Sequence, residues 1–504
     1  MLMGSSGKAH AQDNVTIYAD STAQLIRGYG GAYIHFWRPD MTDEEIQTAF
    51  GTDDGELGFS ILRLGIDPDP NRWHENLNTA RKAQDMGVLI FASPWNAPRD
   101  MLIQGAELDT VATEKYADYA EHLEAFNQFM RENGVDIYAI SVQNEPDYAH
   151  DWTGWSPEGM VKFMRENAPT ITTKVMAPES FQFRREMSDP ILLDSVAASH
   201  TDIIGGHIYG GGLSRYPLAL DMGKEVWMTE HYVDSQDSGN QWHYAMDTGI
   251  EMQRVMSADM SAYVWWYLVR YYGPIADGEV PFIDPTQYFG AKGEVTKKGY
   301  VMSQFSRFIR PGFYRVNTSS HGHFSRVHVT AYKDSTQMVV VATNDNINPR
   351  EVTITLEDAA ASQFSRYVTS ETQDVERLDD VQVVDNTMVV TLEPGTITTF
   401  VSEYRSVSNE AAARAPSSYR LQPNYPNPFA SSTTVGYELP QATEVKLEVF
   451  DVLGRRVATL VEGAMPAGSH EVRFDASRLP AGIYVYRLTG VDDVVLTRTM
   501  TVVK

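Results

Sequence analysis

The sequence contains no cysteine among its 504 residues. This absence excludes disulfide bonds, thiolate nucleophiles and thiolate metal sites. Long apolar segments are absent too: no window approaches the roughly 18 consecutive apolar residues that a membrane-spanning helix requires, so we expect no membrane insertion. Clusters of ligating residues at metal-site spacing are also missing, and we expect neither a metal nor another cofactor.

Positive charge is scarce: 41 lysines and arginines stand against 67 aspartates and glutamates, which gives a formal net charge of −26. Nucleic acids and anionic membranes both reward a basic surface, so neither is an expected partner. Hydrophobic residues make up 42% of the chain and aromatic residues 11%. A chain of this length and composition can bury a large core and is predicted to form two or three domains.

Two glutamates end apolar, strand-like segments: Glu145 ends 141–145 and Glu230 ends 226–230. Their separation, 230 − 145 = 85 residues, is close to three strand-helix repeats of about 30 residues each in a (β/α)8 barrel. The spacing therefore predicts that the pair lies on strands 4 and 7, which face one another across the barrel mouth. Two carboxylates that converge on one bond are typical of a glycosidase.

Eight apolar segments alternate with amphipathic helical patterns such as 114–133 and 157–168. This alternation favours a parallel α/β fold, and eight units at this length favour a closed (β/α)8 TIM barrel over an open sheet. The predicted strands are 27–32, 60–65, 87–93, 137–142, 174–178, 203–209, 225–229 and 262–267.

Short alternating strands follow the barrel and predict a side β-sandwich, to which an N-terminal strand segment contributes. A polar linker of small residues then precedes a small all-β C-terminal domain. Near the start, Ala9 to Ala11 show a small-x-small pattern like a signal-peptidase site, but no apolar core precedes it. The predicted division is a leader or signal-peptide remnant at 1–13, the strand segment at 14–26, the barrel at 27–310, the sandwich at 311–404, the linker at 405–418 and the third module at 419–504.

Retaining glycoside hydrolysis needs a protonated carboxyl group on the leaving oxygen and an ionised one as nucleophile, about 5 to 5.5 Å apart. We assign Glu145 as the acid/base and Glu230 as the nucleophile. Asn144 is placed to hydrogen-bond the sugar 2-hydroxyl. Arg63 ends the second strand, where its cation would keep Glu230 ionised, and Tyr209 ends the sixth, where it could donate to the same carboxylate. A single glutamate at a strand end is more often a helix cap or a surface ion pair, but the pair together favours catalysis.

Aromatic residues gather in the loops that follow the strands. Sugar rings have apolar faces that lie on aromatic side chains, so a saccharide cleft needs such residues beside polar ones. The alternative for each of them is packing at the barrel rim. The candidates for sugar contact are Trp95, Tyr148, Trp152, Tyr232, Trp266 and Tyr272.

Residues 14 to about 404 resemble glycoside hydrolase family 30, and in particular its bacterial glucuronoxylan-specific endoxylanases (subfamily 8). The resemblance implies a (β/α)8 barrel with a side β-sandwich, retaining hydrolysis, and the roles already assigned to Glu145 and Glu230. The strings that carry it are Ser-Val-Gln-Asn-Glu-Pro-Asp-Tyr at 141–148, Trp-Met-Thr-Glu-His-Tyr at 227–232 and Gly-Tyr-Val-Met-Ser-Gln-Phe-Ser-Arg-Phe-Ile-Arg-Pro-Gly at 299–312.

Those xylanases cleave the β-1,4-xylan backbone near a 4-O-methyl-glucuronic acid branch. By motif match, the residues that would hold the branch here are Tyr232, Ser235, Trp266, Arg270 and Tyr272. The set is chemically sensible, because a guanidinium presents paired donors to a carboxylate while hydroxyl groups can satisfy its remaining lone pairs.

Two departures from the family pattern stand out. Val269 occupies a position where a second arginine often precedes the matching one, and we expect only a structural effect. The loop 276–298 is longer than usual and could alter subsites or extend the cleft.

The C-terminal module resembles the type A sorting domain of the type IX secretion system. The resemblance implies transit across the outer membrane of a Bacteroidetes-like bacterium, followed by removal of the module or attachment to the surface. The alternative is a fibronectin-like spacer or a carbohydrate-binding module, although no tryptophan follows residue 419. The matching segments are 421–429, 449–455 and 480–488.

Together these features predict an enzyme: a secreted or cell-surface, retaining endo-β-1,4-xylanase whose partners are glucuronic acid-branched xylan and the secretion machinery. We expect a monomer. Other family 30 activities remain alternatives, namely an unbranched-xylan endoxylanase, a xylobiohydrolase or a β-1,6-glucanase. A non-catalytic polysaccharide-binding protein is the alternative from another class.

Overall fold

The computed structural model forms two compact units, residues 1–406 and 407–504. Most of the predicted leader, the first eleven residues, lies outside the residues that the structure describes. The described residues are 12–103, 108–148, 152–233, 240–279, 288–319, 326–406, 419–424, 427–429, 431–439, 443–465, 468–490 and 495–503.

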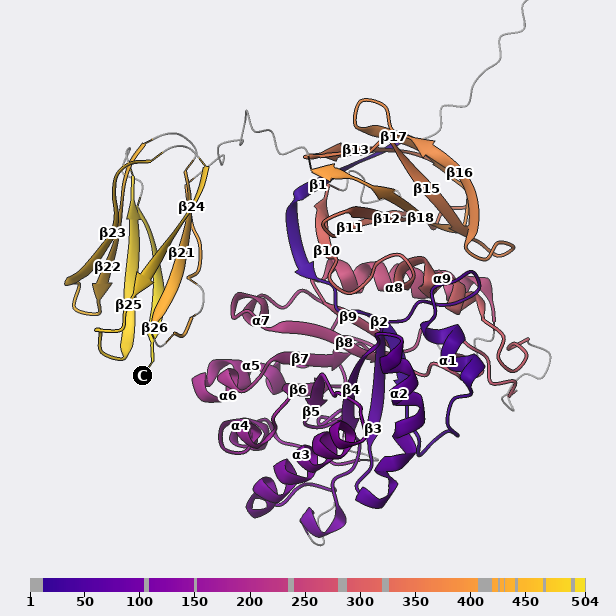
Figure 1. The fold of residues 1–504 in the computed structure, drawn as a ribbon, viewed down its shortest axis with the longest axis horizontal. Coiled ribbons are helices and arrows are strands. Elements are labelled where there is room, and N and C mark those ends of the chain that lie inside the picture. The colour runs from indigo at the N-terminus through magenta and orange to yellow at the C-terminus, as the bar shows by residue number, and fades with distance from the viewer. Residues whose placement is uncertain are drawn as a thin grey trace, which may run out of the picture. The chain divides into compact units, whose positions relative to one another are not determined.

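A closed barrel of eight parallel strands forms the centre of the first unit, which confirms the predicted fold class (Figure 1). Each predicted strand overlaps one barrel strand. Glu230 lies on the seventh of them, and Glu145 lies in the turn that follows the fourth. The strands are β2 (Gly28–Tyr33), β3 (Ile61–Ile66), β4 (Leu89–Pro94), β5 (Ala139–Ser141), β6 (Lys174–Ser180), β7 (Ile203–His207), β8 (Glu225–His231) and β9 (Ala262–Trp265).

The barrel strands are buried on both faces, as their continuous apolar composition requires. Trp227 fills much of the interior and packs edge-on against Phe91, with ring centroids 5.7 Å apart. Glycine allows the first two strands to approach closely, because a Cβ atom on Gly30 would lie 1.8 Å from the carbonyl oxygen of Ile61. The interior therefore has no room for a ligand, and the chemistry is confined to the mouth.

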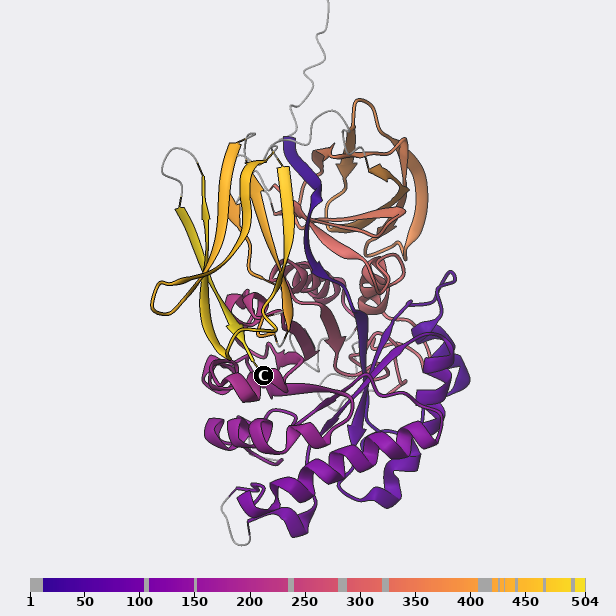
Figure 2. The ribbon, with the colours of Figure 1, turned by 60° about the vertical axis from the view of Figure 1, so that its left-hand side comes forward.

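Helices surround the barrel (Figures 1 and 2). Their starts follow ordinary capping chemistry: Thr42 and Glu45 form a capping box at α1, and Ser156 caps α4 before a proline in the first turn. The helices are α1 (Asp43–Phe50), α2 (Leu77–Asp85), α3 (Tyr116–Glu132), α4 (Pro157–Glu166), α5 (Arg185–Leu193), α6 (Ser195–Ser199), α7 (Pro217–Asp221), α8 (Trp242–Ser257) and α9 (Lys297–Ser306), with 3-10 turns η1 (Pro70–Asn76), η2 (Arg99–Met101), η3 (Thr113–Lys115) and η4 (Ala168–Thr170).

A nine-stranded side sheet packs on α8 and α9, in the order β16-β15-β18-β12-β11-β10-β1-β13-β17 (Figure 1). Residues from both halves of the sheet share one core, so it folds over itself as a sandwich. The N-terminal strand β1 (Gln12–Leu25) joins it between β10 and β13 and begins two residues before the predicted boundary. The others are β10 (Tyr314–Thr318), β11 (Val327–Lys333), β12 (Gln337–Asn344), β13 (Arg350–Glu357), β15 (Gln363–Thr369), β16 (Glu376–Gln382), β17 (Thr387–Leu392) and β18 (Thr396–Glu403).

The predicted linker begins too early. Residues 405 and 406 form a short strand, β19 (Arg405–Ser406), because their backbone pairs with β14 (Ala359–Ala360). The rest of the linker, 407–418, lies outside the described residues.

The second unit is all-β, as predicted, and its strands form two sheets around a core that includes Val435, Leu447, Val449, Tyr486 and Leu488. Among the described residues of the whole chain, no helix combines the length and the apolar character needed to cross a membrane. One sheet contains β20 (Arg420–Leu421), β21 (Ser432–Leu439) and β24 (Gly468–Asp475), and the other β22 (Thr443–Asp451), β23 (Arg456–Met465), β25 (Gly482–Thr489) and β26 (Val495–Val502).

Candidate active site

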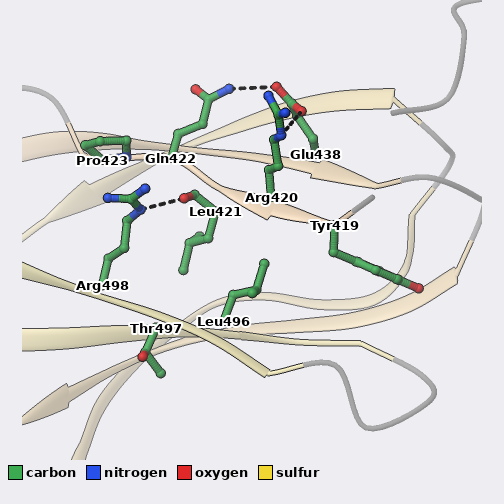
Figure 3. Close-up of a pocket in the computed structure, with 9 residues that line it drawn as sticks. All are labelled: Tyr419, Arg420, Leu421, Gln422, Pro423, Glu438, Leu496, Thr497 and Arg498. Carbon is green, nitrogen blue, oxygen red and sulfur yellow. Dashed lines mark hydrogen bonds and ion pairs between the residues drawn. The ribbon is translucent and has the colours of Figure 1, made fainter. Parts of the chain in front are cut away.

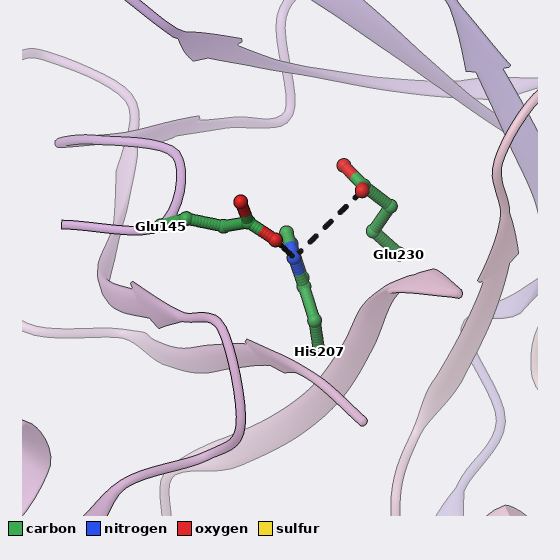
Figure 4. A group of neighbouring side chains, drawn as sticks. All are labelled: Glu145, His207 and Glu230. Atoms are coloured by element: carbon green, nitrogen blue, oxygen red, sulfur yellow. Dashed lines mark hydrogen bonds and ion pairs between the residues drawn. The ribbon is translucent and has the colours of Figure 1, made fainter. Parts of the chain in front are cut away.

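Glu145 and Glu230 converge at the mouth of the barrel (Figure 4). One carboxylate oxygen of each glutamate and a ring nitrogen of His207 all lie within 4.8 Å of one another. All three side chains are buried. The separation fits direct attack by one carboxylate rather than the wider gap, about 6.5 to 9.5 Å, that an inverting enzyme needs for a water molecule.

The backbone at Glu145 is held in an unusual conformation, with φ at 44°, in the left-handed region that side-chain-bearing residues rarely adopt. Its N–H donates to the carbonyl oxygen of Glu179 at 2.9 Å, and its carbonyl oxygen accepts from the N–H of Tyr148 at 3.0 Å. These bonds fix the turn after β5 and aim the carboxyl group across the mouth.

Arg63, on β3, is fully buried and links several site residues. Its guanidinium contacts Glu230 Oε2, donates to Asn144 Oδ1 at 2.6 Å and lies 2.9 Å from Glu179 Oε1. A buried cation requires such partners. Asn144 Nδ2 is buried with no hydrogen-bond partner among the described residues, so this donor is available to a ligand.

Burial and charge separate the protonation behaviour of the buried acids. Burial raises the pKa of Glu145, although the hydrogen bond with His207 opposes the rise. Burial also acts to raise the pKa of Glu179, but the positive charge of Arg63 and the bond with His207 outweigh it and lower that pKa to about 2. Glu145 is thus set up to hold a proton and Glu179 to remain an anion.

His207 and Glu179 were missed as site residues by the sequence analysis. His207 Nδ1 lies 2.8 Å from Glu145 Oε1 and 3.9 Å from Glu230 Oε1, and Nε2 lies 3.6 Å from Glu179 Oε1. Burial lowers the pKa of His207, but the charge of Glu230 and the contacts with Glu145 and Glu179 outweigh burial and raise it to about 9. A signal was present, because His207 lies two residues before Tyr209 in the predicted strand and so shares its side of the strand.

Tyr209 donates its hydroxyl to Glu230 Oε1 at 3.0 Å. The ring of Tyr209 stacks on the ring of Phe181, with 5.5 Å between the ring centroids. The ring of Phe181 in turn stacks on that of Tyr148, with 4.4 Å between the centroids. The stack joins the loop that follows Glu145 to the residue that orients Glu230.

Three tryptophans form a cluster on the other side of the mouth. Trp37 lies edge-on against Trp95 and Trp266, with centroids 5.2 and 5.4 Å away. Trp95 is only 2% exposed and has the guanidinium of Arg63 over its ring at 4.6 Å, which matches the alternative of rim packing. Trp37, which the sequence analysis did not single out, is 46% exposed and is the accessible face of the cluster. Trp152 packs, as Trp266 does, against a buried group that includes Trp95 and Tyr267.

Most of the predicted branch-binding set lies on one path that leads away from the nucleophile. The ring of Tyr232 is 5.4 Å from Tyr209 and 5.3 Å from Tyr272. Tyr272 is in turn within interaction distance of the Arg270 guanidinium, whose side chain is 31% exposed. Ser235 lies outside the described residues.

Both predicted departures lie next to Arg270. Val269 is fully buried and its backbone bridges to Ile275, which agrees with a structural role. In the described parts of the loop 276–298, Ala276 and Glu294 pair through their backbones, and Asp277 Oδ2 lies 3.9 Å from Arg270 Nη1.

A separate pocket of about 580 Å³ lies on the C-terminal domain (Figure 3). Within this pocket, Arg498 Nε donates to the carbonyl oxygen of Leu421 at 2.6 Å. Glu438 is the one acidic residue among those that line the pocket. It has no facing pair of carboxylates and is not a candidate for the hydrolytic site.

Comparisons with known proteins cover both units. The family of secretion system C-terminal sorting domains matches residues 424–502. Glucuronoxylanase XynC of Bacillus subtilis (strain 168) is 40% identical over 413 residues, which are 80% of this chain and 94% of that protein.

Two solved structures resemble the first unit. A glycoside hydrolase family 30 subfamily 8 xylanase, Xyn30A from Clostridium acetobutylicum, is 31% identical with a TM-score of 0.70, and the match covers 77% of this chain and 99% of that one. A GH30 endoxylanase from Clostridium papyrosolvens C71 is 35% identical with a TM-score of 0.69, covering 77% and 100%.

Proposed function

Because the chain belongs to glycoside hydrolase family 30 and carries a secretion sorting domain, we propose that it is an exported, retaining endo-β-1,4-xylanase that cleaves glucuronoxylan at positions set by glucuronic acid branches. The observation that carries the chemistry is the pair of buried carboxylates, Glu145 and Glu230, with oxygens within 4.8 Å. The observation that carries the substrate is the 40% identity to a glucuronoxylanase.

In the first step, Glu230 attacks the anomeric carbon while Glu145 protonates the departing glycosidic oxygen. The new bond joins the sugar to a Glu230 oxygen, and the bond to the leaving chain breaks. Arg63 and Tyr209 hold Glu230 in place from both of its oxygens. Burial, which raises the pKa of Glu145, keeps the required proton available.

In the second step, the ionised Glu145 takes a proton from water, which attacks the anomeric carbon and releases Glu230. Asn144, whose Oδ1 is fixed by Arg63, directs its unpaired Nδ2 donor to the sugar 2-hydroxyl. That interaction strengthens as positive charge develops at the anomeric carbon.

We assign the uronate to Arg270, with Tyr232, Tyr272, Trp266 and Ser235 completing the site. The assignment is supported by a partly exposed guanidinium in a strongly acidic protein, reached from the nucleophile along a continuous row of tyrosines. Arginine suits this role because its planar donors match a carboxylate.

The match of residues 424–502 to secretion sorting domains supports export. It favours a sorting role for this domain over the alternatives of a spacer or a sugar-binding module. We propose that the type IX secretion machinery carries the protein across the outer membrane, with either release or retention at the surface. The monomeric state stays a prediction, and light scattering of the mature enzyme is its test.

Digestion of glucuronoxylan tests the proposal. We expect mass spectra of oligomers that each bear one uronic acid at a fixed position from the reducing end, and NMR of the first products should show retained β-configuration. Glu145→Ala should regain activity on an activated aryl xyloside when azide is added, giving a β-glycosyl azide. Binding without new reducing ends would instead support a non-catalytic polysaccharide-binding protein.

Arg270→Ala separates the uronate hypothesis from the other family 30 activities. A hydrogen bond to a charged group contributes about 1.5 to 3 kcal/mol, so kcat/KM on glucuronoxylan should fall about 10- to 150-fold. Arg165→Ala, which removes a surface arginine paired with Asp194, is the matched control and should change nothing. Unchanged activity of Arg270→Ala on glucuronoxylan would remove the branch assignment and leave the hydrolase intact.

A further inference from the structure

Arg270 already has an anionic neighbour before any substrate binds. Asp277 Oδ2 lies 3.9 Å from Arg270 Nη1, and the Asp277 side chain is only 9% exposed. The other oxygen, Oδ1, accepts from the backbone N–H of Glu279 at 3.0 Å. The carboxylate is therefore held by its own turn and is not a freely moving surface group.

The backbone fixes the distance between the two charges. Arg270 N–H donates to the carbonyl oxygen of Ile275 at 3.0 Å, and Ala276 N–H donates to the carbonyl oxygen of Glu294 at 2.9 Å. Gly278, with φ at 78°, then makes the turn directly after Asp277. Asp277 thus enters the arginine site through the loop at 276–298, which the sequence analysis predicts to depart from the family pattern.

The distance of 3.9 Å is too long for a hydrogen bond and lies near the upper limit for an ion pair. Asp277 therefore lowers the positive potential at Arg270 without occupying its hydrogen-bond donors. A uronate carboxylate that binds those donors would bring a second negative charge beside the first, and like charges in one site oppose each other. Among the residues that the structure describes, Tyr271 and Tyr272 also contact the guanidinium, and they contribute rings and a hydroxyl.

We infer that Asp277 is a specificity-determining residue that weakens binding of the uronate branch and so narrows the preference for branched over unbranched xylan. This inference rests on the proposed function, since it assumes that Arg270 binds the branch. It assigns a chemical role to the loop 276–298, which brings the Asp277 carboxylate close to the position proposed for the carboxylate of the substrate.

Asp277→Asn is the informative variant, because it removes the charge and keeps an oxygen that can accept from Glu279. Two substrates are compared: native glucuronoxylan and the same polymer after reduction of its uronic acids to neutral sugars. We expect the ratio of KM for the reduced polymer to KM for the native polymer to rise about fivefold, the upper range for a partly exposed charge pair. Added salt should bring the KM ratios of the variant and the wild type closer together, because it screens the interaction between the charges.

Glu294→Gln is the matched control, since it removes one negative charge from the same loop, where Glu294 accepts from the N–H of Ala291. It should leave the ratio unchanged. Thermal unfolding of each variant checks that the loop change does not unfold the enzyme.

The outcomes are separable. An unchanged or lower ratio for Asp277→Asn, in an enzyme whose wild type prefers the native polymer, overturns this inference alone; a lower ratio would show that Asp277 orients Arg270. A wild-type enzyme with no preference for the native polymer would instead remove the branch assignment on which the inference rests.

Discussion

Replacing His207 by asparagine tests the electrostatics of the acid/base most directly. His207 Nδ1 lies 2.8 Å from Glu145 Oε1, and its carboxylate neighbours raise the pKa of His207 to about 9, so we expect the ring to be a cation at neutral pH. A cation beside a carboxyl group favours its ionised form. His207→Asn removes the charge but keeps a donor, so the pKa of Glu145 should rise further.

The structure sets the size of the shift. Two unit charges at the observed 2.8 Å interact by about 6 kcal/mol at an effective dielectric constant of about 20, which corresponds to about 4 pKa units. This is an upper bound, because each charge is spread over its ring or carboxylate. Because Glu145 must be protonated for the first step, the basic limb of the kcat/KM profile should move to higher pH, by about 1 to 3 units.

The assay is kcat/KM on glucuronoxylan measured from acid to alkaline pH for wild type and variant. His200→Asn is the control, because His200 Nδ1 contacts a backbone carbonyl oxygen of Met164 at 2.9 Å; its profile should match the wild type. A basic limb that stays in place or moves to lower pH would refute the reasoning, since it would mean that His207 is neutral and accepts the proton of Glu145.

Two further predictions concern the groups around the nucleophile. Glu179→Gln should lower the free energy of unfolding by about 3 kcal/mol at pH 7, as expected when a buried ion pair loses one partner. Because the folded-state pKa of Glu179 is lowered to about 2, the loss should be full above about pH 4.5 and shrink as pH falls toward 2, which urea unfolding at several pH values can measure. Tyr209→Phe removes the hydroxyl that donates to Glu230 and should reduce kcat/KM about 10- to 150-fold with little change in the unfolding midpoint, whereas near-normal activity would show that Arg63 suffices to orient the nucleophile.

The barrel was predictable because its strands are mainly apolar and are separated by amphipathic helices. The spacing of Glu145 and Glu230 then placed both on facing strands without any knowledge of side-chain packing. His207 was only partly accessible to such reasoning: the two-residue period relates it to Tyr209, but its charge state depends on carboxylates from three other strands and loops.

Other parts of the site depend on how loops pack. A tryptophan after a strand can cover the barrel or face the solvent, and the sequence pattern is the same for Trp95, which is buried, and Trp37, which is exposed. The contact between Asp277 and Arg270 likewise arises when a loop turns back, which no local pattern records. The sequence therefore predicts well which residues lie at the ends of the barrel strands. It predicts poorly how exposed those residues are and which ion pairs they form.

The charges of the buried cluster explain why the histidine matters to a reaction in which it makes no bond. Before reaction, the two cations Arg63 and His207 balance the two anions Glu179 and Glu230, while Glu145 is neutral. Attack converts Glu230 to a neutral ester and leaves Glu145 ionised, so the sum remains zero. An uncompensated buried charge is costly, and the cluster carries none either before or after the attack. The two steps of the double displacement therefore have similar electrostatic costs. With His207 neutral, the same cluster would carry one excess negative charge in both states, and its first response would be to hold the proton on Glu145 more tightly.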